Sequence, residues 1–283
     1  MYIILTVASA IFLGFYDLFK KLSTKKSSNV FEILFFYTFS SFLLSFIFIA
    51  DAFSIEHKYI LIYFLKACVV GLNWFCTTKA VSKLDLGLVM PFSMLGTIFT
   101  IVFDYIIFDQ TIGLVQIGGA LIILLGLYLI TLVSKKEEKN NDYKYLMLMV
   151  FAAALSTVSA IIDKKVLTNN GVSGGAASFW FFGFMALIYF VVSLISRRNI
   201  SIDAVKNNKW IILTGICIFA ADLLYYEAVK DVNAPMSAIS IIRKLSVFVG
   251  IVAAGVVLNE GNLLKKILIL LLMFAGLTII IFM

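Results

Sequence analysis

The sequence predicts an all-α polytopic membrane protein with ten transmembrane helices, arranged as two inverted five-helix repeats. Three observations predict this fold class. Of the 283 residues, 62% are hydrophobic and only 14% are charged, whereas a soluble domain has about 45–50% apolar and about 25% charged residues. The apolar residues gather in runs that are long enough to cross a bilayer. Short segments of the first half recur in the second half in the same order.

Ten apolar runs have the length of about 20 residues that a membrane-spanning helix needs. They cover residues 2–22, 30–50, 59–80, 84–108, 112–133, 144–167, 175–195, 209–229, 233–258 and 263–283. Membrane strands are not expected, because such strands have about 9–11 residues and alternate in polarity. The longest polar links, 134–144 and 196–209, are too short to hold a soluble domain.

Basic residues in the links between spans predict the orientation of a membrane protein. Sixteen of the 23 lysine and arginine residues lie in the links after spans one, three, five, seven and nine, and four lie in the links on the other side. This bias places the odd-numbered links in the cytoplasm of a plasma or inner membrane and both termini outside. The net charge of +7 therefore indicates membrane topology, and no nucleic-acid partner is expected.

Two matched segments indicate an internal duplication. "KAVSKLDLG" (79–87) matches "EAVKDVNAP" (227–235), and "IIFDQTI" (106–112) matches "VVLNEGN" (256–262). We therefore expect a first repeat over 1–134, a charged linker over 135–143 and a second repeat over 144–283. With five spans in each repeat, the second copy enters the membrane from the opposite side, as in secondary transporters whose substrate site lies near the bilayer midplane.

Three charged residues lie deep in predicted spans, where charge is costly and by default functional. They are Asp222 in span eight and the adjacent Arg243 and Lys244 in span nine. Adjacent helical residues point about 100° apart. We expect one cation, preferentially Arg243, to face a central cavity and bind a carboxylate or phosphate, with the other cation paired to Asp222. The alternative is that Asp222 and either cation form a pair that only fixes helix packing.

Other polar and aromatic residues complete the candidate site. Asp222 is a candidate proton-coupling residue, because displacement of its cation by an anionic substrate would let it take up a proton. Four further residues either form a wall that faces the substrate or belong to ordinary helix packing, and the sequence leaves both interpretations open. They are Asn73, Trp74, Tyr225 and Tyr226. We expect Lys66 to extend toward the membrane interface and Asp163 to lie near a span end.

Enzyme chemistry is not indicated by the sequence. The only histidine is His57, and no zinc-protease, nucleophile-elbow or phosphate-loop motif occurs. Cys68, Cys76 and Cys217 lie in apolar runs without metal-ligand spacing. We expect no enzyme activity, catalytic residue, metal or cofactor. The expected partners are a small-molecule substrate and the lipid bilayer, and the sequence leaves a monomer and a homodimer both open.

Two segments resemble the drug/metabolite transporter superfamily, in particular its EamA-type ten-helix members. They are "YYEAVKDVNAPMSAI" (225–239) and the acidic residue that opens the last span of a repeat, here Glu260. The first-repeat counterpart, Gln110, departs from the family pattern. Pro91 fits the family's proline inside the fourth span, whereas span nine carries Arg243 and Lys244 instead. Family members commonly have cytoplasmic termini, opposite to the orientation that the basic residues predict here.

The resemblance implies a secondary active transporter, and in particular an exporter, of a small polar metabolite such as an amino acid or related carboxylate. Nothing in the residues themselves encodes the direction of transport. One alternative is a flippase-type transporter of a lipid-linked or nucleotide-linked substrate, which would need a groove open to lipid with cations near the headgroup. A second alternative is a non-catalytic membrane assembly subunit.

Overall fold

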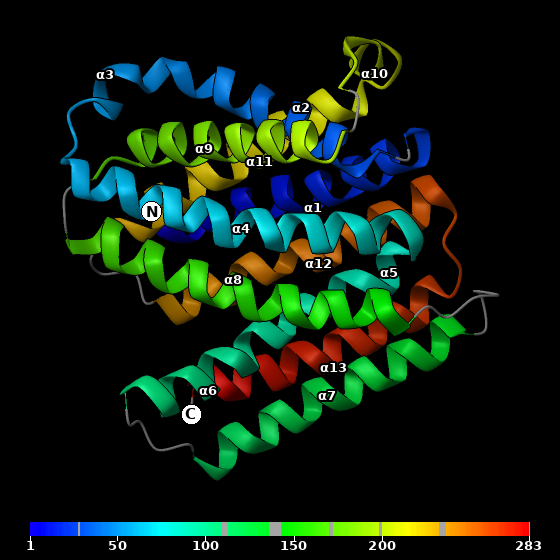
Figure 1. The fold of residues 1–283 in the computed structure, drawn as a ribbon. Helices are drawn as coiled ribbons and strands as arrows, with labels where there is room; N and C mark the ends of the chain where they lie inside the picture. The colour runs from blue at the N-terminus through cyan, green and yellow to red at the C-terminus, as the bar shows by residue number, and fades with distance from the viewer. Residues whose placement is uncertain are drawn as a thin grey trace.

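The computed structural model describes residues 1–27, 29–108, 113–135, 143–169, 172–197, 200–231 and 236–282. Gln110 and most of the predicted linker lie outside these residues. The described chain is helical throughout its regular structure (Figure 1). In chain order the helices, of which η1 and η2 are 3₁₀-helices, are α1 (Tyr2–Lys26), α2 (Val30–Ser45), η1 (Phe46–Phe48), α3 (Ile49–Ala52), α4 (His57–Lys83), α5 (Leu86–Val89), η2 (Met90–Met94), α6 (Leu95–Phe108), α7 (Leu114–Lys135), α8 (Tyr143–Asn169), α9 (Gly174–Ile195), α10 (Ile202–Asn207), α11 (Trp210–Val229), α12 (Met236–Leu258) and α13 (Leu263–Phe282).

Ten helical stretches of the described chain are long and apolar enough to cross a membrane. They follow the ten predicted spans in order, so the predicted fold class is confirmed. The short helix α10 was not predicted and lies in the link after α9. The Ser201 side chain begins α10 by accepting a hydrogen bond from the Asp203 amide at 3.2 Å, as an N-cap serine does.

The fourth span is interrupted where the sequence predicts one continuous helix. It begins as α5, tightens into η2 and continues as α6. Pro91 lies at the start of η2, and a proline has no amide hydrogen with which to continue an α-helical ladder. Main-chain carbonyl groups in this stretch are therefore available to partners from other helices.

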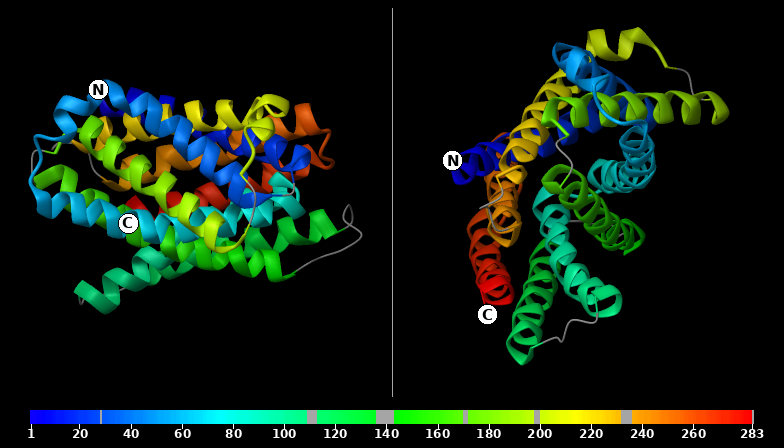
Figure 2. Two further views of the ribbon diagram at one scale, coloured as in Figure 1. Left: turned by 45° about the horizontal axis from the view of Figure 1, so that its top comes forward. Right: turned by 90° about the vertical axis from the view of Figure 1, so that its left-hand side faces the viewer.

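Helices that occupy corresponding places in the two repeats pack against each other. α2 packs against α9, and α7 packs against α13. α1 packs along α11 and α12, and α8 packs along their counterparts α4 and α6. Viewed along the helices, α7 and α13 lie at one end of an elongated cross-section and α2 and α9 lie at the other (Figure 2). Each repeat thus buries its apolar faces mainly against the other repeat.

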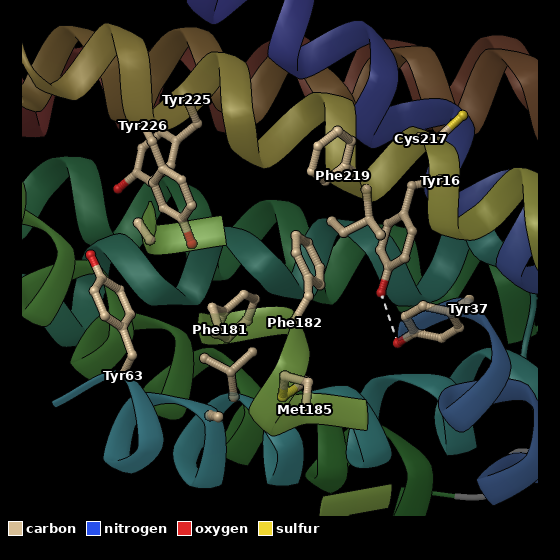
Figure 3. Close-up of a cluster of buried hydrophobic side chains, with 14 of the residues drawn as sticks. Tyr16, Tyr37, Tyr63, Phe181, Phe182, Met185, Cys217, Phe219, Tyr225 and Tyr226 are labelled. Atoms are coloured by element: carbon tan, nitrogen blue, oxygen red, sulfur yellow. Dashed lines mark hydrogen bonds between the residues drawn. The ribbon is translucent and has the colours of Figure 1, made fainter. Parts of the chain in front are cut away.

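Two buried clusters form the core. The first joins α1, α2, α4, α9 and α11 and is rich in aromatic rings, several of which are shown in Figure 3. In it the hydroxyl groups of Tyr16 and Tyr37 lie 3.3 Å apart. The second cluster joins α5, η2, α7, α8, α12 and α13. At the α7–α13 crossing, a Cβ atom on Gly276 would lie 2.7 Å from the Gly119 carbonyl oxygen, so only glycine allows this backbone contact.

Candidate functional site

The first ion pair of the site joins α11 and α12. The Arg243 guanidinium of α12 donates a hydrogen bond to the Asp222 carboxylate of α11. Tyr225 follows Asp222 by three residues and therefore lies on the same face of α11. The Arg243 guanidinium carbon lies 3.9 Å from the centre of the Tyr225 ring, a cation–π contact that fixes the plane of the guanidinium. The Arg243 side chain remains 23% exposed.

Lys244 points away from Asp222. Its ammonium donates a hydrogen bond to the Ser93 carbonyl oxygen at 2.7 Å, at the interruption that Pro91 produces in the fourth span. No carboxylate lies within ion-pair distance of Lys244 among the described residues. The expectation that Lys244 is the cation paired with Asp222 is therefore wrong. The physical reason is the angle between adjacent helical positions, which turns position 243 toward α11 and position 244 toward η2.

A second ion pair, which the sequence did not predict, joins α4 and α8. The Lys66 ammonium lies 2.5 Å from an Asp163 carboxylate oxygen, and the two side chains are only 3% and 6% exposed. Lys66 also donates to the Tyr226 hydroxyl at 2.8 Å and lies 4.5 Å from the centre of the Phe181 ring. Lys66 therefore does not extend to the interface, and Asp163 is not an interfacial carboxylate.

The two ion pairs form one charged cluster. Asp163 interacts electrostatically with both Asp222 and Arg243, and the adjacent residues Tyr225 and Tyr226 contact one pair each. We use the term charged cluster for these two pairs together with Lys244: Lys66, Asp163, Asp222, Arg243 and Lys244. It contains three cations and two carboxylates, so one positive charge is not balanced within it.

Two buried polar atoms beside these ion pairs have no hydrogen-bond partner among the described residues. They are the Tyr63 hydroxyl and the Arg243 Nε atom. The Tyr63 ring centre is 5.9 Å from the Lys66 ammonium, so both atoms belong to the surroundings of the charged cluster. A buried polar group without a partner is costly, and bound water or a polar ligand is the usual explanation.

Asn73 and Trp74 lie apart from the Arg243 pair. The Asn73 side-chain amide donates to the Ala152 carbonyl oxygen of α8 at 2.5 Å, which joins α4 to α8. The Trp74 ring packs in the aromatic cluster, with ring centres 6.0 Å from Tyr16 and 5.5 Å from Tyr37. Of the seven predicted residues, the structure brings together Asp222, Tyr225, Tyr226, Arg243 and Lys244, and it places Asn73 and Trp74 in helix packing.

Metal-binding and thiol groups do not gather in the described part of the chain. No group of three or more His, Cys, Asp and Glu side chains there is placed to hold a metal ion. The three cysteines are free, with Cys68 exposed and Cys76 and Cys217 buried.

Comparisons with known proteins agree with this architecture. The EamA-like transporter family matches the chain twice, over residues 1–132 and 144–282. No curated protein matches the chain. A solved structure described only as "Crystal structure of protein" has 11% sequence identity and a TM-score of 0.63, and the match covers 96% of each chain. That likeness shows a shared fold. Because the family matches nearly all of both halves, this chain belongs to the EamA-like transporter family, a family of multi-pass membrane transporters.

Proposed function

We propose that the protein is a secondary transporter that exports a small polar metabolite with an anionic group, such as an amino acid or a related carboxylate. Transport proceeds by alternating access between the two repeats. The observation that carries the proposal is the charge of Lys244, whose hydrogen-bond partner is a neutral main-chain carbonyl. The Asp17 carboxylate acts on Lys244 only from beyond ion-pair distance and is itself paired with Lys20. A carboxylate or phosphate oxygen of a substrate would balance the Lys244 charge, which is otherwise costly within a membrane.

The surroundings of the charged cluster support a polar rather than a purely apolar substrate. Tyr63 Oη and Arg243 Nε are buried without partners among the described residues, and Tyr225 and Tyr226 provide aromatic surface beside the charges. A few polar groups set in an apolar and aromatic wall are typical of small-molecule sites. The excess of basic residues in the odd-numbered links supports a cytoplasmic location for those links.

The flippase alternative receives no support from the groove that opens beside α7 and α8. A groove of about 480 Å³ opens between α7, α8 and the start of α6, and none of its lining residues carries a charge. A headgroup phosphate or diphosphate would need cations at such a groove.

A counterflow screen in proteoliposomes tests the proposed function. We expect transport of at least one amino acid or organic acid, and loss of competition when its carboxylate is converted to a neutral amide. A matched panel of neutral sugars and nucleosides serves as the control. Transport that is indifferent to the charge of the carboxylate would contradict the proposal.

Proton coupling through Asp222 gives a separate prediction. When an anionic substrate engages the Arg243 guanidinium, the Asp222 carboxylate loses part of its compensation and can bind a proton. We expect Asp222→Asn to abolish uptake driven by a pH gradient while substrate exchange at equal pH continues. The measurement is a comparison of the two modes in the same vesicles. Normal gradient-driven uptake by this variant would exclude Asp222 as the proton carrier.

A further inference from the structure

A carboxylate from the second repeat binds the start of the fourth span in the first repeat. Glu260, in the link between α12 and α13, accepts hydrogen bonds from the Leu86 amide at 2.9 Å and from the Gly87 amide at 2.8 Å. The Glu260 side chain is only 6% exposed. The first amides of a helix have no partner within the helix and attract negative charge. One charged group thus joins the two repeats at this end of the molecule, on the right in Figure 1.

The residues around Glu260 are fitted to this contact. The Lys266 ammonium of α13 lies 3.9 Å from the carboxylate, and the Lys266 side chain is 1% exposed. A Cβ atom on Gly87 would lie 2.8 Å from Lys266 Cδ, so a larger residue does not fit there. From α1, the Lys21 ammonium donates to the Val81 and Leu84 carbonyl oxygens at 2.8 and 2.7 Å. The junction between α4 and α5 is therefore held by both repeats.

The sequence of the duplicated segment does not reproduce these groups. In the repeat alignment Glu260 corresponds to Gln110, and Gly87 corresponds to Pro235. Glutamine lacks the negative charge of glutamate, and proline has no amide hydrogen to donate. Gln110 and Pro235 lie outside the described residues, so this comparison rests on the sequence alone. It predicts that the same contact at the opposite end lacks both its charge and one of its two donors.

The last two spans of the second repeat are also packed differently from the last two spans of the first repeat. α12 packs against α13, whereas α6 packs against α8 and η2 and not along α7. A groove of about 180 Å³ lies between α6 and α7, lined by residues such as Ile98, Val102 and Ile117. The α12–α13 hairpin beside Glu260 is therefore packed more closely than the corresponding α6–α7 hairpin of the first repeat.

We propose that Glu260 is a positioning residue that clasps the two repeats at the odd-numbered links, so that this end is closed in the resting transporter and opens when the clasp is lost. The word clasp denotes the contact of Glu260 with Leu86 and Gly87. The proposal rests on the alternating access of the proposed function, because only then does closing one end select the side from which the charged cluster is reached.

The clasp weakens as the pH falls. Burial raises the pKa of Glu260 above the usual value for glutamate, and the neighbouring Asp85 charge raises it further. The Gly87 and Leu86 amides and Lys266 act in the opposite direction. The charged groups that face the clasp are thus Asp85 beside α5, Lys266 on α13 and Lys21 on α1. Protonation removes the charge that binds the two amides, so mild acid favours opening of this end.

A distance measurement on the full-length protein tests the clasp without any substrate. Spin labels are placed at Lys83→Cys and Lys265→Cys, two exposed positions on either side of the clasp, after the native cysteines are replaced by alanine. In nanodiscs at neutral pH we expect one short distance. Glu260→Gln should increase the population with a longer distance about tenfold, as loss of a charge-assisted hydrogen bond implies. The exposed Glu56→Gln serves as the matched control and should change nothing.

A second variant keeps the proposal testable if Glu260→Gln does not fold. Gln110→Glu combined with Pro235→Gly gives the opposite end the missing charge and the missing donor, and it leaves the clasp intact. It should also increase the longer distance, because it stabilises the state that is closed at the opposite end. An unchanged distance distribution in either folded variant would overturn the proposal. A negative transport screen would count against the proposed function alone, since these distances are measured without substrate.

Discussion

Asp163→Asn is expected to destabilise the fold severely, lowering the free energy of unfolding by about 3–5 kcal/mol. The Lys66 and Asp163 side chains are almost completely buried. Removing the carboxylate therefore leaves the Lys66 ammonium without its ionic partner in a medium of low dielectric constant. Unfolding in mixed detergent micelles, followed by circular dichroism, measures the difference between the variant and the wild type.

The double variant Lys66→Met/Asp163→Leu separates two contributions to the free energy of unfolding: the destabilisation by one unpaired buried charge, and the stabilisation by the ion pair itself. Replacing both members of a buried ion pair by apolar residues is often neutral or even stabilising. We therefore expect the double variant to regain most of the lost stability. Lys58→Met, which breaks an exposed pair with Glu56, serves as the control and should change stability by less than about 1 kcal/mol. Wild-type stability of Asp163→Asn would show that the buried pair does not hold α4 to α8.

Lys244→Met is expected to lower the specificity constant for the transported anion by about tenfold to a hundredfold, as loss of a charged hydrogen-bond donor implies. The fold should persist, because the described bond of Lys244 is the one to the Ser93 carbonyl, and methionine can occupy a similar volume. Concentration-dependent uptake into proteoliposomes measures the change. Lys244→Arg keeps the positive charge and should retain most of the transport.

A matched lysine controls for the loss of a single positive charge. Lys230, at the end of α11, forms an exposed pair with Glu227 one turn earlier on the same helix, so Lys230→Met should leave transport close to that of the wild type. If Lys244→Met transports the anion as well as Lys230→Met does, Lys244 is not the cation that receives it.

The fold could be predicted because its signal is long and repetitive. Each span is an apolar run of sufficient length, and that property alone places ten helices in order. The interruption of the fourth span was missed, although Pro91 is visible in the sequence. A proline is compatible with either a kinked helix or a change to 3₁₀ geometry, and only the packing of neighbouring helices decides between them.

The charged cluster was predicted only in part, for a geometric reason. Asp222 and Arg243 stand out because each lies in the middle of a span. Lys66 and Asp163 lie nearer to span ends, and they meet because α4 begins and α8 ends at the same side of the molecule. Counting their positions from that shared side would have placed them at similar depths. The choice between Arg243 and Lys244 as the partner of Asp222 depends on the rotation of α12, which hydropathy does not encode.

The backbone contact between Gly119 and Gly276 is a pivot point between the two repeats. Because the two backbones touch at this point, α7 and α13 can tilt about it, whereas sliding along each other is opposed by the side chains of Ile122 and Ile280 that pack beside the glycines. A small tilt at the crossing becomes a larger displacement at the helix ends, in proportion to their distance from it. We therefore expect the ends of this protein to move as levers while the α7–α13 crossing stays almost fixed.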